Sequence, residues 1–216
     1  MHQAPPTPTT AYPGSEQNAI AFVPPRMPEL QARLWFQKRW YGAMGRVLRL
    51  VFPWKRLSRN ALPRLELIWM PHYLFTVRAV GPDGDEGRIQ FSLDAHAGVF
   101  MIVKLAGELD QGECTEQHFP PSMPREEAEI LGRKQLTLAL LRRRGHRDRP
   151  TPHETLDCQL FYYPFWTYYY ERMPGAIDIA VLDAVSGEKV GGRTKTAVLD
   201  AFTAASARKK SADEAL

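Results

Sequence analysis

Apolar residues recur at helical spacing in three segments of the chain. The first runs from Pro28, which suits the first turn of a helix, to Phe52. The second, 122–144, starts at a Ser122 cap, and a third, shorter helix covers 194–209. We expect each helix to bury one apolar stripe. In chain order the expected stripes are Phe36, Trp40, Ala43, Met44, Val47, Leu48, Leu50 and Val51; Ile130, Leu131, Leu138 and Leu141; and Val198, Leu199 and Phe202.

Alternation of apolar and polar residues predicts strands between these helices. The clearest case is Ile89, Phe91 and Leu93 with polar residues between them, which is typical of a half-buried antiparallel strand. The run 99–103 is wholly apolar and predicts an interior strand. Prolines 71 and 164 interrupt two strands, so we expect these strands to be bent or to lie at an edge. The other expected strands are 65–69, 158–170, 176–183 and 189–191.

The two halves of the chain share a short pattern. Trp-Met-Pro-His-Tyr at 69–73 is similar to Tyr-Tyr-Pro-Phe-Trp at 162–166, and Leu-Asp-Ala-x-x-Gly occurs at 93–98 and 182–187. The same order of helix, aromatic strand and Asp turn indicates an internal duplication. An aspartate at a strand end can accept backbone N–H groups, and a glycine supplies the positive φ that closes a hairpin. The expected structural turn residues are Asp94, Gly98, Asp183 and Gly187.

These patterns predict an α+β fold of two tandem repeats, each an amphipathic helix packed on a short antiparallel sheet, with disordered termini. Residues 1–28 hold seven of the eighteen prolines and cannot bury enough apolar surface to offset their ordering entropy. The expected segments are a disordered tail at 1–27, a first repeat at 28–106, a linker at 107–121, a second repeat at 122–207 and a tail at 208–216.

A helix, an aromatic strand and a strand ending in Asp-Ala-x-x-Gly together resemble the PepSY-like module, with its cystatin-like helix-on-sheet shape and terminal Asp-Ala-x-Thr-Gly hairpin. The similarity is best over 177–190, where Ser186 stands in the place of the threonine. The resemblance implies a small non-enzymatic binding or inhibitory module. The family is mostly extracytoplasmic, whereas no export signal is visible in this sequence.

Basic residues are concentrated in one segment. The net charge is +4, yet the stretch from Arg26 to Arg64 holds ten Lys or Arg and a single acid, Glu29. Tryptophans lie beside these charges, a composition typical of a helix at an anionic membrane surface. The basic residues can equally be a helix face that is only solvated, or they can bind the phosphate backbone of a nucleic acid. The residues predicted to bind an anionic surface are Lys38, Arg39, Arg46, Arg49, Lys55 and Arg56.

The strand at 160–170 is unusually aromatic. Eight of its eleven residues are Phe, Tyr or Trp, out of 23 in the whole chain. Such a strand can be buried on both faces, with tyrosine hydroxyls reaching water. It can also form an exposed surface for a partner protein or a stacking platform for single-stranded nucleic acid. The residues predicted to bind a partner are Tyr163, Phe165, Trp166 and Tyr168.

No motif for catalysis, a cofactor or a metal is convincing. Cys114, His118, His153 and Cys158 could supply four zinc ligands, but their spacing is neither that of a finger nor that of a ribbon. No nucleophile elbow and no phosphate-binding loop are present. We therefore expect no catalytic residue, no metal and no cofactor.

The sequence thus predicts a non-enzymatic binding or adaptor protein that acts through protein–protein contacts. Its basic aromatic helix would dock on an anionic surface, either a membrane or a partner. The alternative is a nucleic-acid-binding module that uses the basic helix and the aromatic strand. No apolar run is long enough to span a bilayer, so we expect a cytoplasmic protein that is peripheral to the membrane.

Overall fold

The structure is a computed structural model that describes residues 20–40, 65–105, 107–112, 117–142, 149–173 and 176–213. Helices and strands both contribute, which confirms the α+β class. Within the described residues no helix is long and apolar enough to cross a membrane. The elements are β1 (Ile20–Phe22), α1 (Glu29–Trp40), β2 (Leu65–Val80), β3 (Glu86–Asp94), β4 (Phe100–Val103), β5 (Asp110–Gly112), β6 (Gln117–His118), α3 (Arg125–Arg142), β7 (Thr151–Met173), β8 (Ala176–Asp183) and α4 (Gly192–Asp213).

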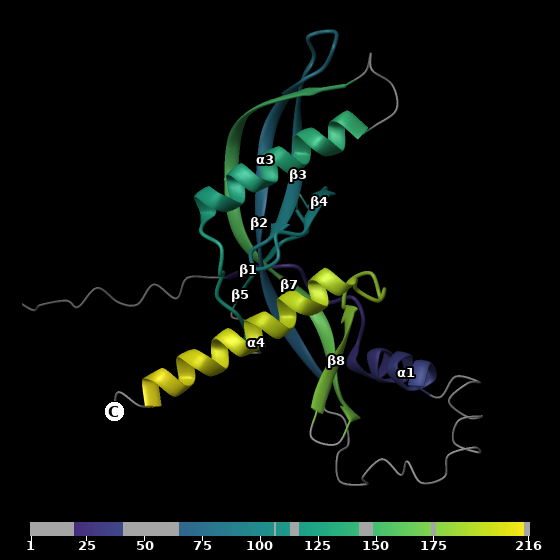
Figure 1. The fold of residues 1–216 in the computed structure, drawn as a ribbon. Helices are drawn as coiled ribbons and strands as arrows, with labels where there is room; N and C mark the ends of the chain where they lie inside the picture. Colours follow the sequence, from purple (N-terminus) through teal and green to yellow (C-terminus); the bar gives the residue numbers. More distant parts are fainter. Residues whose placement is uncertain are drawn as a thin grey trace, which may run out of the picture.

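The long antiparallel strands β2 and β7 form the spine of the molecule (Figure 1). Their pairing runs from Leu65 opposite Tyr168 to Val80 opposite Thr151. The sheet order is β4-β3-β2-β7-β1-β5, with β6 on β2 and β8 on β7. The chain therefore forms one continuous sheet of eight strands across the described residues. The expected pair of separate short sheets, one for each tandem repeat, is not what the structure has.

The two strand prolines lie on the central strands, so of the two predicted alternatives, bent strands or edge strands, the edge position is wrong. Pro71 pairs with Tyr162 of β7, and its carbonyl accepts the Ala95 N–H from the β3 side at 2.9 Å. Pro164 accepts the Ala184 N–H in the same way, at 3.2 Å. The N and O of one strand residue point to the same side. The missing proline N–H therefore faces the hairpin turn and costs no β2–β7 hydrogen bond.

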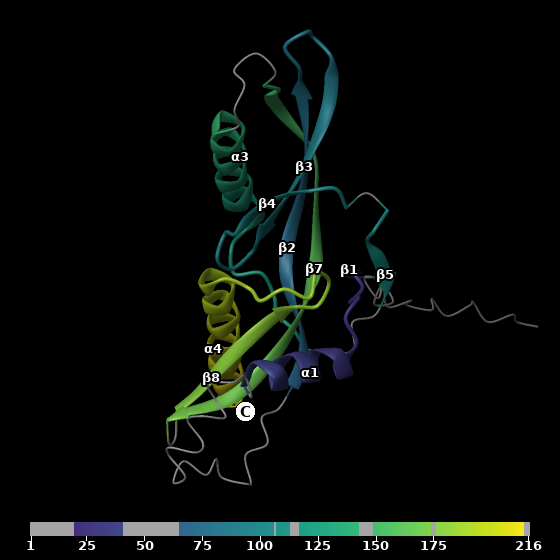
Figure 2. The ribbon, with the colours of Figure 1, turned by 90° about the vertical axis from the view of Figure 1, so that its right-hand side faces the viewer.

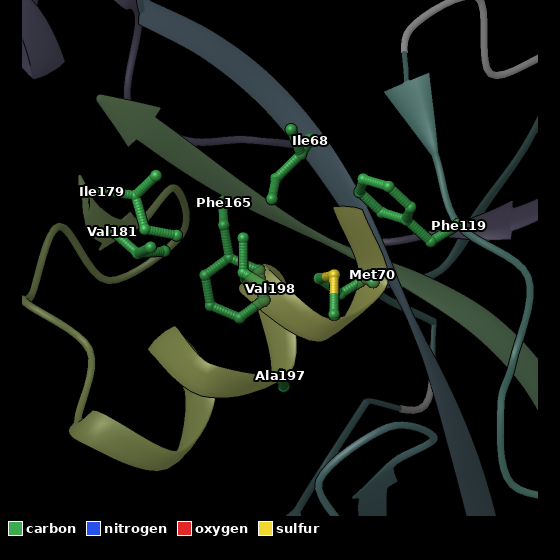
Figure 3. Packing of buried hydrophobic residues seen from close by; sticks show 9 residues of the cluster. Ile68, Met70, Phe119, Phe165, Ile179, Val181, Ala197 and Val198 are labelled. Atoms are coloured by element: carbon green, nitrogen blue, oxygen red, sulfur yellow. The ribbon is translucent and has the colours of Figure 1, made fainter. Parts of the chain in front are cut away.

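The helices cover the two ends of this spine. Helix α3 lies at one end, against β2 and β3, whereas α4 and α1 lie at the other (Figures 1 and 2). Figure 3 shows α4 placing Ala197 and Val198 against Phe165, Ile68 and their neighbours. Because β2 and β7 run through both ends, each end contains residues from both halves of the chain.

Helix α1 packs on β7 and β8, with Leu65 and Leu67 at the start of β2 beside the same cluster, and does not cover the β2–β3 hairpin as the tandem arrangement predicts. Its Ala32 and Phe36 share a buried cluster with Trp166 and Leu182. The Trp166 indole N–H donates to the Met27 carbonyl at 2.9 Å, and Phe36 stacks on Tyr168 with ring centroids 4.9 Å apart. The first helix of the sequence therefore covers the hairpin of the second half.

Helix α3 buries a different stripe from the one expected. Its buried residues are Ala128, Gly132, Leu136 and Leu140. Of the expected stripe, Leu131 is half-buried and packs on the core, whereas Ile130, Leu138 and Leu141 are 73%, 44% and 55% exposed. Small residues determine which face of the helix turns toward the sheet. A Cβ on Gly132 would lie 2.4 Å from a ring carbon of Phe91, so no larger residue fits at this position. The helix thus lies close to the sheet along Ala128 and Gly132.

Four predicted boundaries also change. The tail predicted at 1–27 includes β1, and Ala21, Val23 and Met27 are buried. Ala21 and Val23 pack with Leu74 and Phe161, and Met27 packs with Trp166 and Leu182. The linker predicted at 107–121 contributes β5 and β6. The run 99–103 gives β4 at the edge of the sheet, not an interior strand. Helix α4 extends through residues predicted as a frayed tail. Residues 41–52 of the predicted first helix lie outside the described residues.

We predict that Gly132→Ala lowers the free energy of unfolding by about 1–2 kcal/mol, because the new methyl group overlaps Phe91 and overpacking costs about 1–3 kcal/mol. In a Phe91→Leu background the same change should stabilise by up to about 1 kcal/mol, the helix-propensity difference between glycine and alanine. Urea unfolding of the four proteins measures both effects. The same sign in both backgrounds would contradict the packing described here.

Candidate functional site

Both Asp turns have the geometry of closed hairpins. One carboxylate oxygen of Asp94 accepts the N–H groups of His96 and Ala97, at 2.6 and 2.8 Å. Asp183 accepts the N–H groups of Val185 and Ser186, at 2.8 and 2.9 Å. Gly98 and Gly187 take positive φ values of 61° and 74°. These four residues therefore shape the turns.

The aromatic residues expected to face a partner are buried or half-buried. Phe165 and Trp166 are 5% and 8% exposed and belong to different clusters, on opposite faces of β7. Tyr163 donates its hydroxyl to Asp183 at 3.1 Å, and Tyr168 is covered by Phe36. The prediction of an exposed aromatic surface is wrong for Phe165 and Trp166, which are buried on opposite faces, whereas for the half-buried Tyr163 and Tyr168 it stays a prediction.

The predicted basic site falls mostly outside the described residues. Arg46, Arg49, Lys55 and Arg56 belong to 41–64, which the structure does not describe. Lys38 and Arg39 belong to the last turn of α1, and their side chains are likewise outside the described part. Binding to an anionic surface stays a prediction.

A buried polar cluster lies near the centre of the spine. The His72 Nδ1 lies 3.1 Å from the Ser92 hydroxyl, while its Nε2 is buried without a hydrogen-bond partner among the described residues. Burial lowers the pKa of His72 below its ordinary value of 6.5, although the carboxylates of Asp94 and Asp183 act in the opposite direction. His72 is thus held neutral in the folded protein.

Other titratable groups are tied into the structure. Burial, together with the Asp183 charge, raises the pKa of Tyr163. Burial also raises the pKa of the Cys158 thiol to about 11, which leaves it a poor nucleophile near neutral pH. Lys195 lies 2.6 Å from Asp178, and the hydrogen bond from Lys195 is the main reason that the pKa of Asp178 is lowered. None of these groups is set up for acid–base or nucleophilic catalysis.

An accessible apolar surface lies beside β4. This strand is the edge of the sheet and pairs, among the described residues, with β3 alone. Its Met101 and Ile102 side chains are 48% and 40% exposed. A groove of about 870 Å³ adjoins it, with apolar side chains that include Ile102, Leu140 and Leu156. Two exposed cations, Arg88 and Lys104, also line this groove.

Two other edge strands, β5 and β8, carry charges, whereas β4 does not. Strand β5 has three residues and begins with Asp110. Strand β8 contains Asp178 and ends at Asp183. Charges, short length and prolines are the usual devices that keep an edge from pairing with another chain. Strand β4 reads Phe-Met-Ile-Val and has neither a charge nor a proline. The candidate site is therefore the β4 edge together with the groove beside it.

Sequence reasoning missed this site because it took 99–103 for an interior strand. The signal available was Lys104, directly after the apolar run, which is unusual at the end of a fully buried strand. The sequence also contains a repeat that the pattern analysis did not use. The segment Pro-Pro-x-Met-Pro occurs at 24–28, before α1, and at 120–124, before α3.

Metal ligation finds no support in the described residues, where no three His, Cys, Asp or Glu side chains gather. Cys114 lies outside these residues, so the four-ligand arrangement is not described. No protein-family model, curated protein or solved structure matches this chain. The resemblance to PepSY-like modules stays a prediction.

We predict that the protein loses stability as the pH falls below about 6.5 and that His72→Phe reduces this loss. A folded-state pKa below the unfolded value means that the unfolded chain binds the proton first, so the contribution of His72 is complete above pH 6.5 and declines below it. Urea unfolding at pH 7.5 and 5.5 gives the change for each protein. The other histidines are common to both proteins, so an unchanged difference would refute the role of His72.

Proposed function

We propose that this protein is a non-enzymatic binding module that takes up an extended, acidic segment of a partner protein along β4. The observation that carries the proposal is the exposed, uncharged edge of β4 beside a groove that holds two cations. An extended peptide that adds a strand to a free sheet edge gains main-chain hydrogen bonds from the edge and specificity from neighbouring pockets.

The free edge offers a defined set of backbone groups. The Asp94 N–H donates to the Val99 carbonyl, and the β3–β4 register pairs Ser92 with Met101. Antiparallel pairs alternate between bonded and non-bonded. Met101 and Val103 therefore bond to β3, whereas Phe100 and Ile102 direct their N–H and C=O groups outward. A partner strand would bond to these two residues.

The charges beside the edge favour an acidic segment. Arg88 lies on β3 and Lys104 directly follows β4, and both are exposed. Asp157 is the single carboxylate among the groove residues. A partner carboxylate would meet two cations there, and complementary charge sets specificity and association rate more than affinity.

The groove offers little for catalysis. Its lining contains no histidine, cysteine or serine, and the Thr76 hydroxyl already accepts a hydrogen bond from Gln90 at 3.3 Å. A nucleic-acid module is the alternative, but the β7 rings Phe161, Tyr162, Phe165 and Trp166 are buried and cannot stack on bases. These facts favour a protein partner.

We predict that an eight-residue peptide alternating valine and glutamate slows amide hydrogen exchange at Phe100 and Ile102 at least tenfold. Met101 and Val103 should already be protected in the free protein, because they bond to β3. Exchange measured by NMR at about 1 mM peptide tests this alternation. Unchanged exchange at both residues would overturn the proposal. Binding of a single-stranded oligonucleotide in its place would favour the alternative function.

Two variants sharpen this test. Ile102→Pro removes an outward N–H but no β3–β4 bond, so the fold should remain and the peptide should no longer protect these amides from exchange, whereas Ile102→Val should retain this protection.

Reversing both cations, Arg88→Glu with Lys104→Glu, should make the protein prefer a peptide with lysine in place of glutamate. An unchanged preference would refute the charge argument.

The basic segment adds a second contact to this proposal. The charge between Arg26 and Arg64 supports docking of the adaptor on an anionic membrane surface. Arg39, Arg46 and Arg49, changed together to Gln, should weaken binding to phosphatidylserine-containing vesicles roughly 100-fold, at about 1 kcal/mol for each residue. Sedimentation with vesicles measures this.

A matched control changes three exposed cations elsewhere, Lys134, Arg142 and Arg193, to Gln and should bind as the parent does. Equal binding by the parent and the first triple variant would leave the segment without a membrane role.

A further inference from the structure

Two arms of the chain dock on two hairpins. We call residues 20–40 the first arm and 117–142 the second arm; each runs from a short strand through Pro-Pro-x-Met-Pro into a helix. The first arm lies on the β7–β8 hairpin and the second on the β2–β3 hairpin, at opposite ends of the spine (Figure 2). We call these hairpins the β7–β8 socket and the β2–β3 socket.

The first arm docks through backbone hydrogen bonds. The Val23 N–H donates to the Tyr162 carbonyl at 3.0 Å. Arg26 and Met27 both donate to the Ala184 carbonyl, at 3.0 and 2.8 Å. The fourth hydrogen bond comes from the Trp166 indole N–H, which donates to the Met27 carbonyl.

The second arm repeats this set contact for contact. The Phe119 N–H donates to the Trp69 carbonyl at 3.2 Å. Ser122 and Met123 both donate to the Ala95 carbonyl, at 3.2 and 2.9 Å. The Tyr73 hydroxyl donates to the Met123 carbonyl at 3.0 Å, in the position that Trp166 holds in the other socket.

The register of the spine relates the two sockets by a twofold axis. Pro71 pairs with Tyr162, and its counterpart Pro164 pairs with Trp69. The exchange of partners places the axis between Met70 and Tyr163, which pair with each other. Two edge-to-face ring contacts are related by the same twofold axis. The ring centroids of Phe22 and Trp69 lie 5.3 Å apart, and those of His118 and Tyr162 lie 5.7 Å apart.

We propose that the chain is a fused pair of like units that have exchanged arms, and that the β7–β8 socket is a recognition site for the first arm, which a second copy of the chain can supply. Each arm precedes its own half of the spine in sequence but docks on the other half. This is the arrangement of an arm-exchanged dimer joined into one polypeptide.

Large and small residues pair each arm with its socket. In the β7–β8 socket the arm supplies the large residue, since Phe36 packs beside Ala180 and on Tyr168. In the β2–β3 socket the arm supplies Gly132 and the sheet supplies Phe91. Gly132 stands where Phe36 does relative to the Met-Pro pair, so exchanging the arms would produce a cavity in one socket and a clash in the other.

The connection to the first arm permits supply from another copy. Residues 41–64 join this arm to β2 and can span up to roughly 80 Å. The arm is the N-terminal described segment, and no described element has to be threaded to release it. Because the connection belongs to the same chain, it keeps the arm near its own socket at an effective concentration of about 1 mM. The intact protein should therefore keep its own arm docked in dilute solution.

The test uses a synthetic peptide of residues 20–40 and full-length variants. Met27→Asp places a carboxylate at a buried docking residue and should release the arm while the socket stays intact. The peptide should bind this variant about 100-fold more tightly than it binds the parent, where it competes with the tethered arm. Binding is measured by anisotropy of a labelled peptide, and circular dichroism checks that each variant is folded.

Controls separate docking from general damage. Leu30→Asp changes an exposed residue of the same helix, 69% exposed, and should bind the peptide as weakly as the parent does. Adding Ala184→Leu to Met27→Asp should abolish binding, because Ala184 is fully buried under the arm. A peptide with Phe36→Gly should bind at least tenfold more weakly.

If Met27→Asp proves unfolded, the milder Met27→Ala replaces it with the same expected ranking. Mixing full-length Met27→Asp with full-length Ala184→Leu should give a heterodimer by light scattering that neither protein forms alone. Absence of peptide binding to a folded Met27 variant, together with absence of the heterodimer, would overturn the proposal. The β4 experiments are independent of either result.

Discussion

The antiparallel pairing of β2 with β7 is the constraint on which the rest of the molecule depends. It fixes Pro71 opposite Tyr162 and Pro164 opposite Trp69. Each proline carbonyl then accepts the N–H of the alanine that follows the turn aspartate, so the register of the spine determines where each hairpin closes. A slip of one residue would turn every side chain of the spine to the opposite face and separate the cores from their helices.

The sequence predicted those parts of the fold that depend on interactions between residues close together in the chain. The turns at Asp94 and Asp183 follow from an acceptor at a strand end and a glycine with positive φ. The start of α3 follows from Pro124, directly before its first residue Arg125. The predicted Ser122 cap is not what the structure has, because the Ser122 hydroxyl donates to the Ala95 carbonyl at 3.0 Å. The stripe of α3 did not follow, because Gly132 gives no apolar signal although it permits the closest approach to Phe91.

The exchange of arms could not be predicted from periodicity. A hydrophobic pattern shows that α1 buries Phe36 but not which hairpin receives it. The repeated Pro-Pro-x-Met-Pro segment was readable, and it would have placed the start of the first unit at 20–24 and not at Pro28. The aromatic density of β7 has a comparable explanation, since this strand is covered on both faces and contributes to clusters at both ends.

The two halves differ where the proposed binding surface lies. After Gly187 the chain forms a single bridge at Lys189 and then turns at Gly191 into α4, which covers the sheet. After Gly98 it continues as β4, so this half gains an edge strand and no helix follows directly. The two hairpins that the halves share thus form the core of the fold. The strand β4, which among the described residues only the first half has, exposes Met101 and Ile102.

Each arm docks on the hairpin of the other half within one molecule. Methyl–methyl nuclear Overhauser effects in dilute, selectively labelled protein test this arrangement. We expect effects from Met27 to Ala184 and from Met123 to Ala95, unchanged on dilution. Effects from Met27 to Ala95, or from Met123 to Ala184, would contradict it.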